Sequence, residues 1–274
     1  MTSLDLPAWS EPFSHPDALV RSMPLAGVSR AWAWGGSTGA GIRVGVIDSG
    51  LEVEHPRLNG RVVDSVAVRL VDGEPEIVPD DGADLYGHGT ACAGIILGLA
   101  PDVELVSIRV LGADLRGKGT AFAAGLEWAI EQGIGVLNLS LSSKSEALFS
   151  VFHDLADRAY FRNVALVCAA NNVPAASYPS LFSSVFSVAA HGEPDPRRVY
   201  YNPAPPVEFG AWGVDVPIAW KDGGSTVATG NSFAAPHVAG MVALIMAKHP
   251  GMTPFEVKAV LAAIADNPIR HEDG

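Results

Sequence analysis

The sequence has few basic side chains, only two cysteines and no long apolar run. Its 18 Lys and Arg residues face 30 Asp and Glu residues, which gives a formal net charge of −12. Because phosphate binding needs clustered basic groups, this balance argues against nucleic acid as a partner. No stretch reaches the roughly 18 consecutive apolar residues of a membrane-spanning helix, so we expect no membrane partner either.

The two cysteines, Cys92 and Cys168, are far apart, whereas a small disulfide-stapled secreted domain normally has more. We therefore expect free thiols. The first residues, MTSLDLPAWSEPF, lack the positive flank and apolar run of a signal peptide, which predicts a cytoplasmic protein. With 274 residues, 48% of them hydrophobic and 18% charged, the chain is expected to fold as a single domain over 1–274.

Apolar runs of strand length alternate with amphipathic stretches of helical length, which predicts an α/β fold with a mostly parallel sheet. The predicted strands are 42–47, 104–110, 135–139 and 164–169. The predicted helices are 120–132, 149–162, 237–249 and 253–265. Residues 1–40 and 192–227 show no clear period and are expected to form surface loops and short elements.

Three short motifs carry side chains suited to catalysis. Asp48 follows the predicted strand at 42–47, at the carboxyl edge where open α/β sheets build their sites. His88 stands between glycines in GHGT, before a small apolar helix. Ser232, in GNSFAAPH, opens a buried helix whose N-terminus favours developing negative charge. Taken singly, each motif also fits a turn or a helix cap.

Together the motifs resemble those of the subtilisin family of serine peptidases. VGVIDSGLEVEHP is similar to the family's Asp motif, GHGTACAG to its His motif and GNSFAAPHVAG to its Ser motif, in the same order and 40 and 144 residues apart. The similarity runs from about residue 31 to 268. It implies a three-layer subtilisin-like fold, with helices on both faces of the central sheet, and serine endopeptidase activity.

The resemblance also assigns roles. Ser232 would attack the scissile carbonyl, His88 would take the serine proton, and Asp48 would orient His88. The strand ending VALVCAANN is similar to the family's Ala-Ala-Gly-Asn ending, which makes Asn172 the side-chain donor to the oxyanion. No cofactor is expected. No metal is expected either, because Arg57 follows His-Pro where secreted relatives commonly have a calcium-binding Asp.

The chain departs from the family pattern at three positions next to these residues. Asn171 stands where Gly is usual, Asn231 where Thr is usual, and Phe233 where Met is usual. Asn171 adds a side chain to the wall of the primary substrate pocket. Asn231 is either a second helper at the oxyanion or only a spacer.

The substrate positions follow from the same resemblance. The segment Leu115, Arg116 and Gly117 would be an edge strand that pairs with the backbone of a protein or peptide substrate. The primary pocket would be lined by Ser140, Leu141, Ser142, Ala169 and Asn171. Polar side chains replace glycines in this pocket, so we expect it to be narrow and the specificity to be restricted.

Other functions remain open at this point. Only 47 residues precede Asp48, too few for both a signal and an inhibitory propeptide, so we expect an enzyme that acts on an intracellular substrate. An acyl-transferring macrocyclase or transpeptidase would use the same residues but would need a lid to exclude water. A catalytically silent peptide-binding module would use the edge strand alone. The sequence does not predict an oligomeric state.

Overall fold

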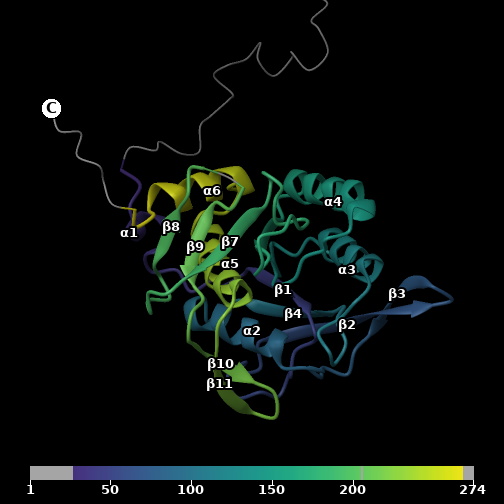
Figure 1. The fold of residues 1–274 in the computed structure, drawn as a ribbon. Coiled ribbons are helices and arrows are strands. Elements are labelled where there is room, and N and C mark those ends of the chain that lie inside the picture. The colour runs from purple at the N-terminus through teal and green to yellow at the C-terminus, as the bar shows by residue number, and fades with distance from the viewer. Residues whose placement is uncertain (1–26, 205, 268–274) are drawn as a thin grey trace, which may run out of the picture.

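The computed structural model describes residues 27–204 and 206–267, and these form three layers (Figure 1). The middle layer is a nine-stranded sheet with the strand order β3-β2-β4-β1-β5-β6-β7-β9-β8. Its strands are β1 (Arg43–Asp48), β2 (Val62–Val71), β3 (Glu74–Pro79), β4 (Glu104–Arg109), β5 (Val136–Leu139), β6 (Ala165–Ala169), β7 (Phe186–His191), β8 (Val199–Tyr201) and β9 (Phe209–Trp212). Neighbours pair in parallel except for β3 and β8 at the two edges.

Helices cover both faces of this sheet. One face carries α1 (Arg30–Trp34), α2 (His88–Leu99), α5 (Asn231–Lys248) and α6 (Pro254–Ala263), and the other carries α3 (Gly119–Glu131), the 3-10 turn η3 (Glu146–Leu148) and α4 (Phe149–Phe161). Strand β1 contributes to the hydrophobic cores on both faces of the sheet. Val46 belongs to the core beneath α2 and α5, and Ile47 to the core beneath α3 and α4. The predicted three-layer α/β fold is therefore confirmed. In the described ranges no helix is both long enough and apolar enough to cross a bilayer.

The four predicted strands are found as β1, β4, β5 and β6, with ends that differ by one residue at most. Three predicted helices are likewise found as α3, α4 and α6. Helix α6 begins with a capping box, in which the Thr253 side chain accepts from the backbone N–H of Glu256. Strands buried on both faces have continuous apolar sequences, which is why these segments were predictable.

The prediction for 237–249 was wrong at its start, because α5 begins six residues earlier, at Asn231. Pro236 lies inside this helix, where it lacks the N–H that would bond to the carbonyl of Ser232. The Ser140 hydroxyl donates to that carbonyl instead, at 2.8 Å. A tertiary hydrogen bond thus satisfies a group that the helix itself leaves free.

Residues 192–227 were expected to form surface loops and short elements, and the structure shows short strands in this range. For the matching expectation over 1–40, residues 1–26 lie outside the described residues. Strands β8 and β9 lie in the former range, as do β10 (Val216–Trp220) and the start of β11 (Gly224–Ala228), which pair as a separate hairpin. These strands have only three to five residues and are partly exposed, so they carry little periodic signal.

The topology fixes where a site can form. Strand β1 lies between β4 and β5, and the chain passes from one side of β1 to the other through α3. The carboxyl end of β1 is therefore a switch point of the sheet, the usual place for a site in open α/β folds. Asp48 is the last residue of β1.

Candidate active site

Asp48 forms a buried pair with His88. The Asp48 side chain is fully buried, and its carboxylate accepts the backbone N–H of Ser49 at 2.7 Å. The Nδ1 atom of His88 lies 2.9 and 2.8 Å from the two oxygens of the same carboxylate. Because an ionised carboxylate can only accept, Nδ1 carries the hydrogen, and Nε2 of the neutral ring is left as a proton acceptor.

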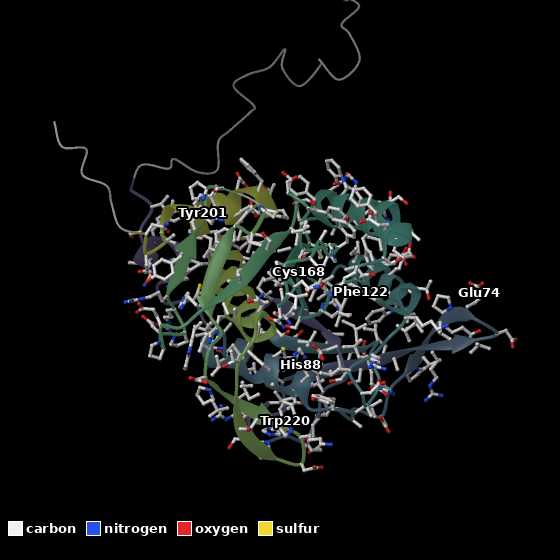
Figure 2. The ribbon with its side chains drawn as sticks, in the orientation of Figure 1. Glu74, His88, Phe122, Cys168, Tyr201 and Trp220 are labelled. Atoms are coloured by element: carbon white, nitrogen blue, oxygen red, sulfur yellow. The ribbon has the colours of Figure 1, made fainter. Side chains whose placement is uncertain are left out.

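His88 is the first residue of α2 and lies near the centre of the molecule, as Figure 2 shows. Gly87 before it has a φ of 112°, which side-chain-bearing residues rarely adopt. A Cβ on Gly89 would lie 2.1 Å from the carbonyl oxygen of Gly50. Both glycines are therefore needed to bring the start of α2 against the end of β1.

Asp84 holds this junction, a role that sequence reasoning missed. One oxygen of its carboxylate accepts the Ser49 hydroxyl at 2.7 Å and the backbone N–H groups of Tyr86 and Gly87 at 3.0 and 2.7 Å. The other accepts the N–H and the hydroxyl of Thr90 at 2.8 and 2.7 Å. The sequence feature that could have indicated this role is the position of Asp84, three residues before Gly87, which precedes the first residue of α2.

The surroundings raise the pKa of His88. Burial by itself would lower it, but the charge of Asp48 and the hydrogen bond to its carboxylate raise it, and the charge of Asp84 adds to this. The net direction is upward from the ordinary value of 6.5. A raised pKa means that the protonated form of His88 is stabilised, which suits a residue that must accept a proton as a general base.

Ser232 is the second residue of α5 and lines the same hollow of about 580 Å³ as His88. Its hydroxyl donates to the carbonyl oxygen of Ser140 at 3.2 Å. Among the residues that the structure describes, no hydrogen bond joins Ser232 to His88. Catalytic hydrogen bonds are often long before substrate binds, so the shared hollow is the relevant relationship.

Asn172 lines this hollow too. Its side-chain oxygen accepts the backbone N–H of Asn231 at 2.9 Å. The oxygen of the amide is therefore occupied, whereas no acceptor in the described ranges takes its two hydrogens. These hydrogens are available to an acceptor that develops in the hollow.

The Asn231 side chain does not take part in the hollow. Its oxygen accepts the N–H of Ala190 at 2.8 Å, and its nitrogen donates to the carbonyls of Ala170 and Asn171 at 3.1 and 3.2 Å. Both hydrogens of the amide are thereby used, so the hypothesis of a second oxyanion helper is not supported by this geometry.

The predicted substrate residues fall into two groups. Leu115, Arg116, Gly117, Leu141 and Ser142 come together around a hollow of about 390 Å³. Leu115 also lines the hollow that holds His88, so the two hollows adjoin. Within the described ranges this segment belongs to none of the strands: it follows a turn in which the Gly112 N–H donates to the Arg116 carbonyl, and Leu115 has a φ of 56°. Its pairing with a substrate backbone stays a prediction.

The other predicted pocket residues are placed differently. Ser140 is buried, with its hydroxyl on the carbonyl of Ser232, and Ala169 is a core residue that is 3% exposed. Both residues are thus largely buried, and their place in the primary pocket stays a prediction. The Asn171 side chain accepts the N–H of Val173 at 3.0 Å, and Asn171 lines a different hollow with that residue.

Acidic side chains that could bind a metal ion form ion pairs or hydrogen bonds with other side chains. The Asp80 carboxylate pairs with Arg109, and the Asp80 side chain is 1% exposed. Within the described ranges, one set of possible ligand atoms, from Asp48, His88 and Cys92, lies within 4.8 Å of one another. A metal ion there would displace the Asp48–His88 hydrogen bonds. Burial also raises the pKa of Cys92 well above its ordinary value, so its thiol stays protonated.

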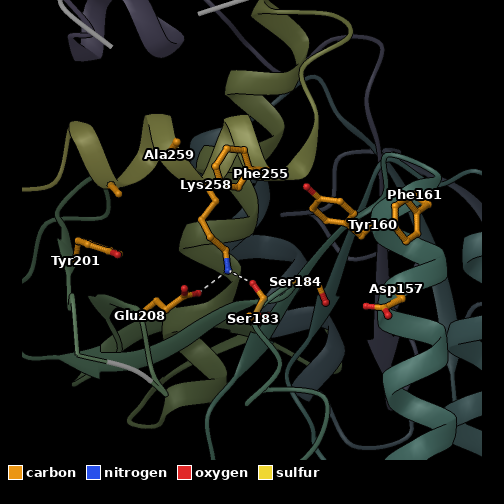
Figure 3. A pocket seen from close by; sticks show the side chains of 11 residues that line it. Asp157, Tyr160, Phe161, Ser183, Ser184, Tyr201, Glu208, Phe255, Lys258 and Ala259 are labelled. Atoms are coloured by element: carbon orange, nitrogen blue, oxygen red, sulfur yellow. Dashed lines mark hydrogen bonds and ion pairs between the residues drawn. The ribbon is translucent and has the colours of Figure 1, made fainter. Parts of the chain in front are cut away.

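Another hollow of about 580 Å³ lies between α4 and α6 (Figure 3). Its wall includes Lys258, whose ammonium donates to Glu208 at 2.6 Å and to the carbonyl of Ser183 at 2.7 Å. None of the predicted site residues lines it. Asp48, His88 and Ser232 lie instead at the carboxyl end of β1 and at the starts of α2 and α5.

Comparison with known proteins agrees with this geometry. Residues 39–273 match the model of the Subtilase family. Subtilisin BL of Lederbergia lenta is 36% identical over 81% of this chain and 82% of its own length. Subtilisin DY of Bacillus licheniformis is 32% identical over 85% and 86%. A crystal structure of a cold-adapted subtilisin-like serine proteinase has 30% identity and a TM-score of 0.69 over 83% of both chains.

Proposed function

This chain belongs to the subtilase family and is a serine endopeptidase, and we propose that it cleaves peptide bonds through Asp48, His88 and Ser232. The observation that carries the assignment is the buried hydrogen-bonded pair of Asp48 and His88, whose histidine shares a hollow with Ser232. The relatives' names also imply a protein or peptide as the substrate.

The proposed reaction begins with a rotation of the Ser232 side chain. Its hydroxyl leaves the carbonyl of Ser140 and donates to Nε2 of His88. The oxygen then bonds to the scissile carbonyl carbon while its proton passes to Nε2, and the imidazolium returns this proton to the leaving amine. Asp48 stabilises the imidazolium, and water hydrolyses the acyl-enzyme with His88 again as the base.

The negative oxygen of the tetrahedral intermediate needs donors that are already in place. In this proposal Asn172 supplies one from its amide nitrogen, because its oxygen is held by the backbone of Asn231. The first N–H groups of α5 add the positive end of a helix dipole at Ser232. Donors fixed before the reaction need no reorganisation as the charge develops.

We further propose a restricted specificity and an intracellular substrate. Ser142 brings a side chain to the hollow beside the site where the family pattern has a glycine, and Leu115 lines both adjoining hollows. The thiols of Cys92 and Cys168 are free and buried, which suits a reducing compartment. Digestion of a peptide library, read by mass spectrometry, would identify the preferred residues, and cell fractionation would locate the protein.

The test of the catalytic assignment is labelling by a fluorophosphonate probe, which reacts with activated serines. The wild type should be labelled at Ser232, and Ser232→Ala and His88→Ala should not. A third variant, Ser183→Ala, controls for the probe because Ser183 lies in the hollow of Figure 3 and should leave labelling unchanged. Labelling that persists in folded Ser232→Ala would overturn the assignment.

A further inference from the structure

Asn231 joins three segments that are distant in the sequence. It is the first residue of α5, and its side chain reaches Ala190 in β7 and both Ala170 and Asn171 after β6. One amide thus accepts one N–H and donates to two carbonyls. Hydrogen bonds therefore connect Asn231, the residue before Ser232, to the loop that follows β6.

The same residue holds Asn172 through its backbone. The N–H of Asn231 donates to the side-chain oxygen of Asn172 at 2.9 Å. The loop from Ala170 to Asn172 is consequently held at three successive residues, two by the side chain and one by the main chain of Asn231. Rotation of the Asn172 amide would break the bond to the Asn231 N–H, and a shift of the loop would have to break the bonds to Ala170 and Asn171 as well.

Two departures from the family pattern meet at this point. Asn171 and Asn231 are 60 positions apart in the sequence, yet the side-chain nitrogen of Asn231 lies 3.2 Å from the carbonyl oxygen of Asn171. The side chain of Asn171 in turn accepts the N–H of Val173. A residue with a single hydroxyl at position 231 has one hydrogen to donate and would be unable to satisfy both carbonyls.

We propose that Asn231 is a positioning residue of the oxyanion site, which fixes the loop from Ala170 to Asn172 so that the Asn172 amide points at the developing charge. It acts through Asn172 and does not itself contact the substrate, since both of its amide hydrogens are occupied. The inference rests on the proposed function, in which Asn172 is the oxyanion donor. Its consequence is that position 231 controls kcat more than substrate binding.

The variant Asn231→Asp tests this most directly. It keeps an oxygen for the N–H of Ala190 and the backbone N–H for Asn172, but it puts a carboxylate against the carbonyls of Ala170 and Asn171. We expect kcat on a peptide substrate to fall about tenfold or more, with KM changed less than about threefold. Inhibition by a peptide aldehyde, whose tetrahedral adduct uses the oxyanion site, should weaken in proportion to kcat.

A double-mutant cycle with Asn172→Ala gives the decisive readout. If Asn231 acts through Asn172, its substitution should cost less than about threefold once the Asn172 amide is gone. An equal loss in both backgrounds would show that Asn231 only supports the fold and would overturn the proposal. Should Asn231→Asp fail to fold, Asn231→Thr takes its place in the same cycle, and the same two outcomes decide.

Asn202 provides a matched control. Its side chain donates to the carbonyls of Ala204 and Val207, both at 2.8 Å, and accepts the N–H of Ala204 at 3.0 Å, in the segment between β8 and β9. Asn202→Asp should therefore lower Tm much as Asn231→Asp does but leave kcat unchanged. A failure of the proposed function itself would appear separately, as turnover that survives Ser232→Ala.

Discussion

The imidazole of His88 is hydrogen bonded through Nδ1 to both carboxylate oxygens of Asp48, at 2.9 and 2.8 Å. This pair has a direct consequence for the pH dependence of activity. The base must be neutral to accept the serine proton, and the pKa of His88 is raised above 6.5. Activity should therefore fall as the pH falls through a value above 6.5, which a profile of kcat/KM against pH measures.

Asp48→Asn provides the matched variant for this profile. The substitution removes the charge that raises the pKa of His88, so the acidic limb should move to lower pH. It also favours the wrong tautomer, and kcat should drop by several orders of magnitude. An acidic limb that stays in place in this variant would assign the titration to another group.

Asn172→Ala should reduce kcat strongly while changing KM little. The expected loss is about 100- to 1000-fold, the range measured when an oxyanion donor is removed from subtilisin itself. Asn172→Asp is the informative comparison, because it keeps the oxygen that accepts from Asn231 but replaces the donor by a negative charge. It should be at least as damaging, and steady-state kinetics that show otherwise would mean that Asn172 serves only the loop.

Asp84→Ala should both destabilise the protein and lower its activity. The change removes five hydrogen bonds between the loop, the Ser49 hydroxyl and the start of α2, which predicts a loss of about 2 to 3 kcal/mol in the free energy of unfolding. Because the start of α2 carries His88, kcat should also fall at temperatures where the variant is folded. Denaturant titration and kinetics measure the two effects.

The control for Asp84 is Asp195→Ala. Asp195 accepts the N–H of Arg197 at 2.9 Å and lies 3.9 Å from the Arg198 guanidinium, in the segment between β7 and β8. Its removal should change the free energy of unfolding by about 0.5 kcal/mol or less and leave kcat unaltered. Similar effects of both substitutions on kcat would contradict a specific role for Asp84.

Phe233 should make the site resistant to peroxide. Its ring lies 5.4 Å from the His88 ring, next to the nucleophile, where the family pattern has an oxidisable methionine. Conversion of a methionine there to the sulfoxide would put a polar group against the base. Wild-type activity should survive a peroxide treatment that inactivates Phe233→Met, and equal inactivation of the two proteins would refute the idea.

The order of the motifs and the buried strands was predictable because both are local signals. Strands β1, β4, β5 and β6 are mostly apolar and largely buried, and Asp48, His88 and Ser232 stand in short patterns. By contrast, the segments after residue 192 were expected only as loops and short elements, since a strand depends on a partner that the local pattern does not specify. For the same reason, the pairing of Leu115 to Gly117 with a substrate backbone stays a prediction.

The sequence by itself determined the family, the fold class and the residue types available for catalysis, because these depend on motifs and on hydrophobic periodicity. Only the tertiary structure decided how those residues are held. Asp84 lies 36 positions from Asp48 yet joins its strand end to α2, and Asn231 lies 59 positions from Asn172 yet orients it. The physical reason is that a hydrogen bond between distant segments depends on where each element ends in space, and spacing along the chain does not encode that.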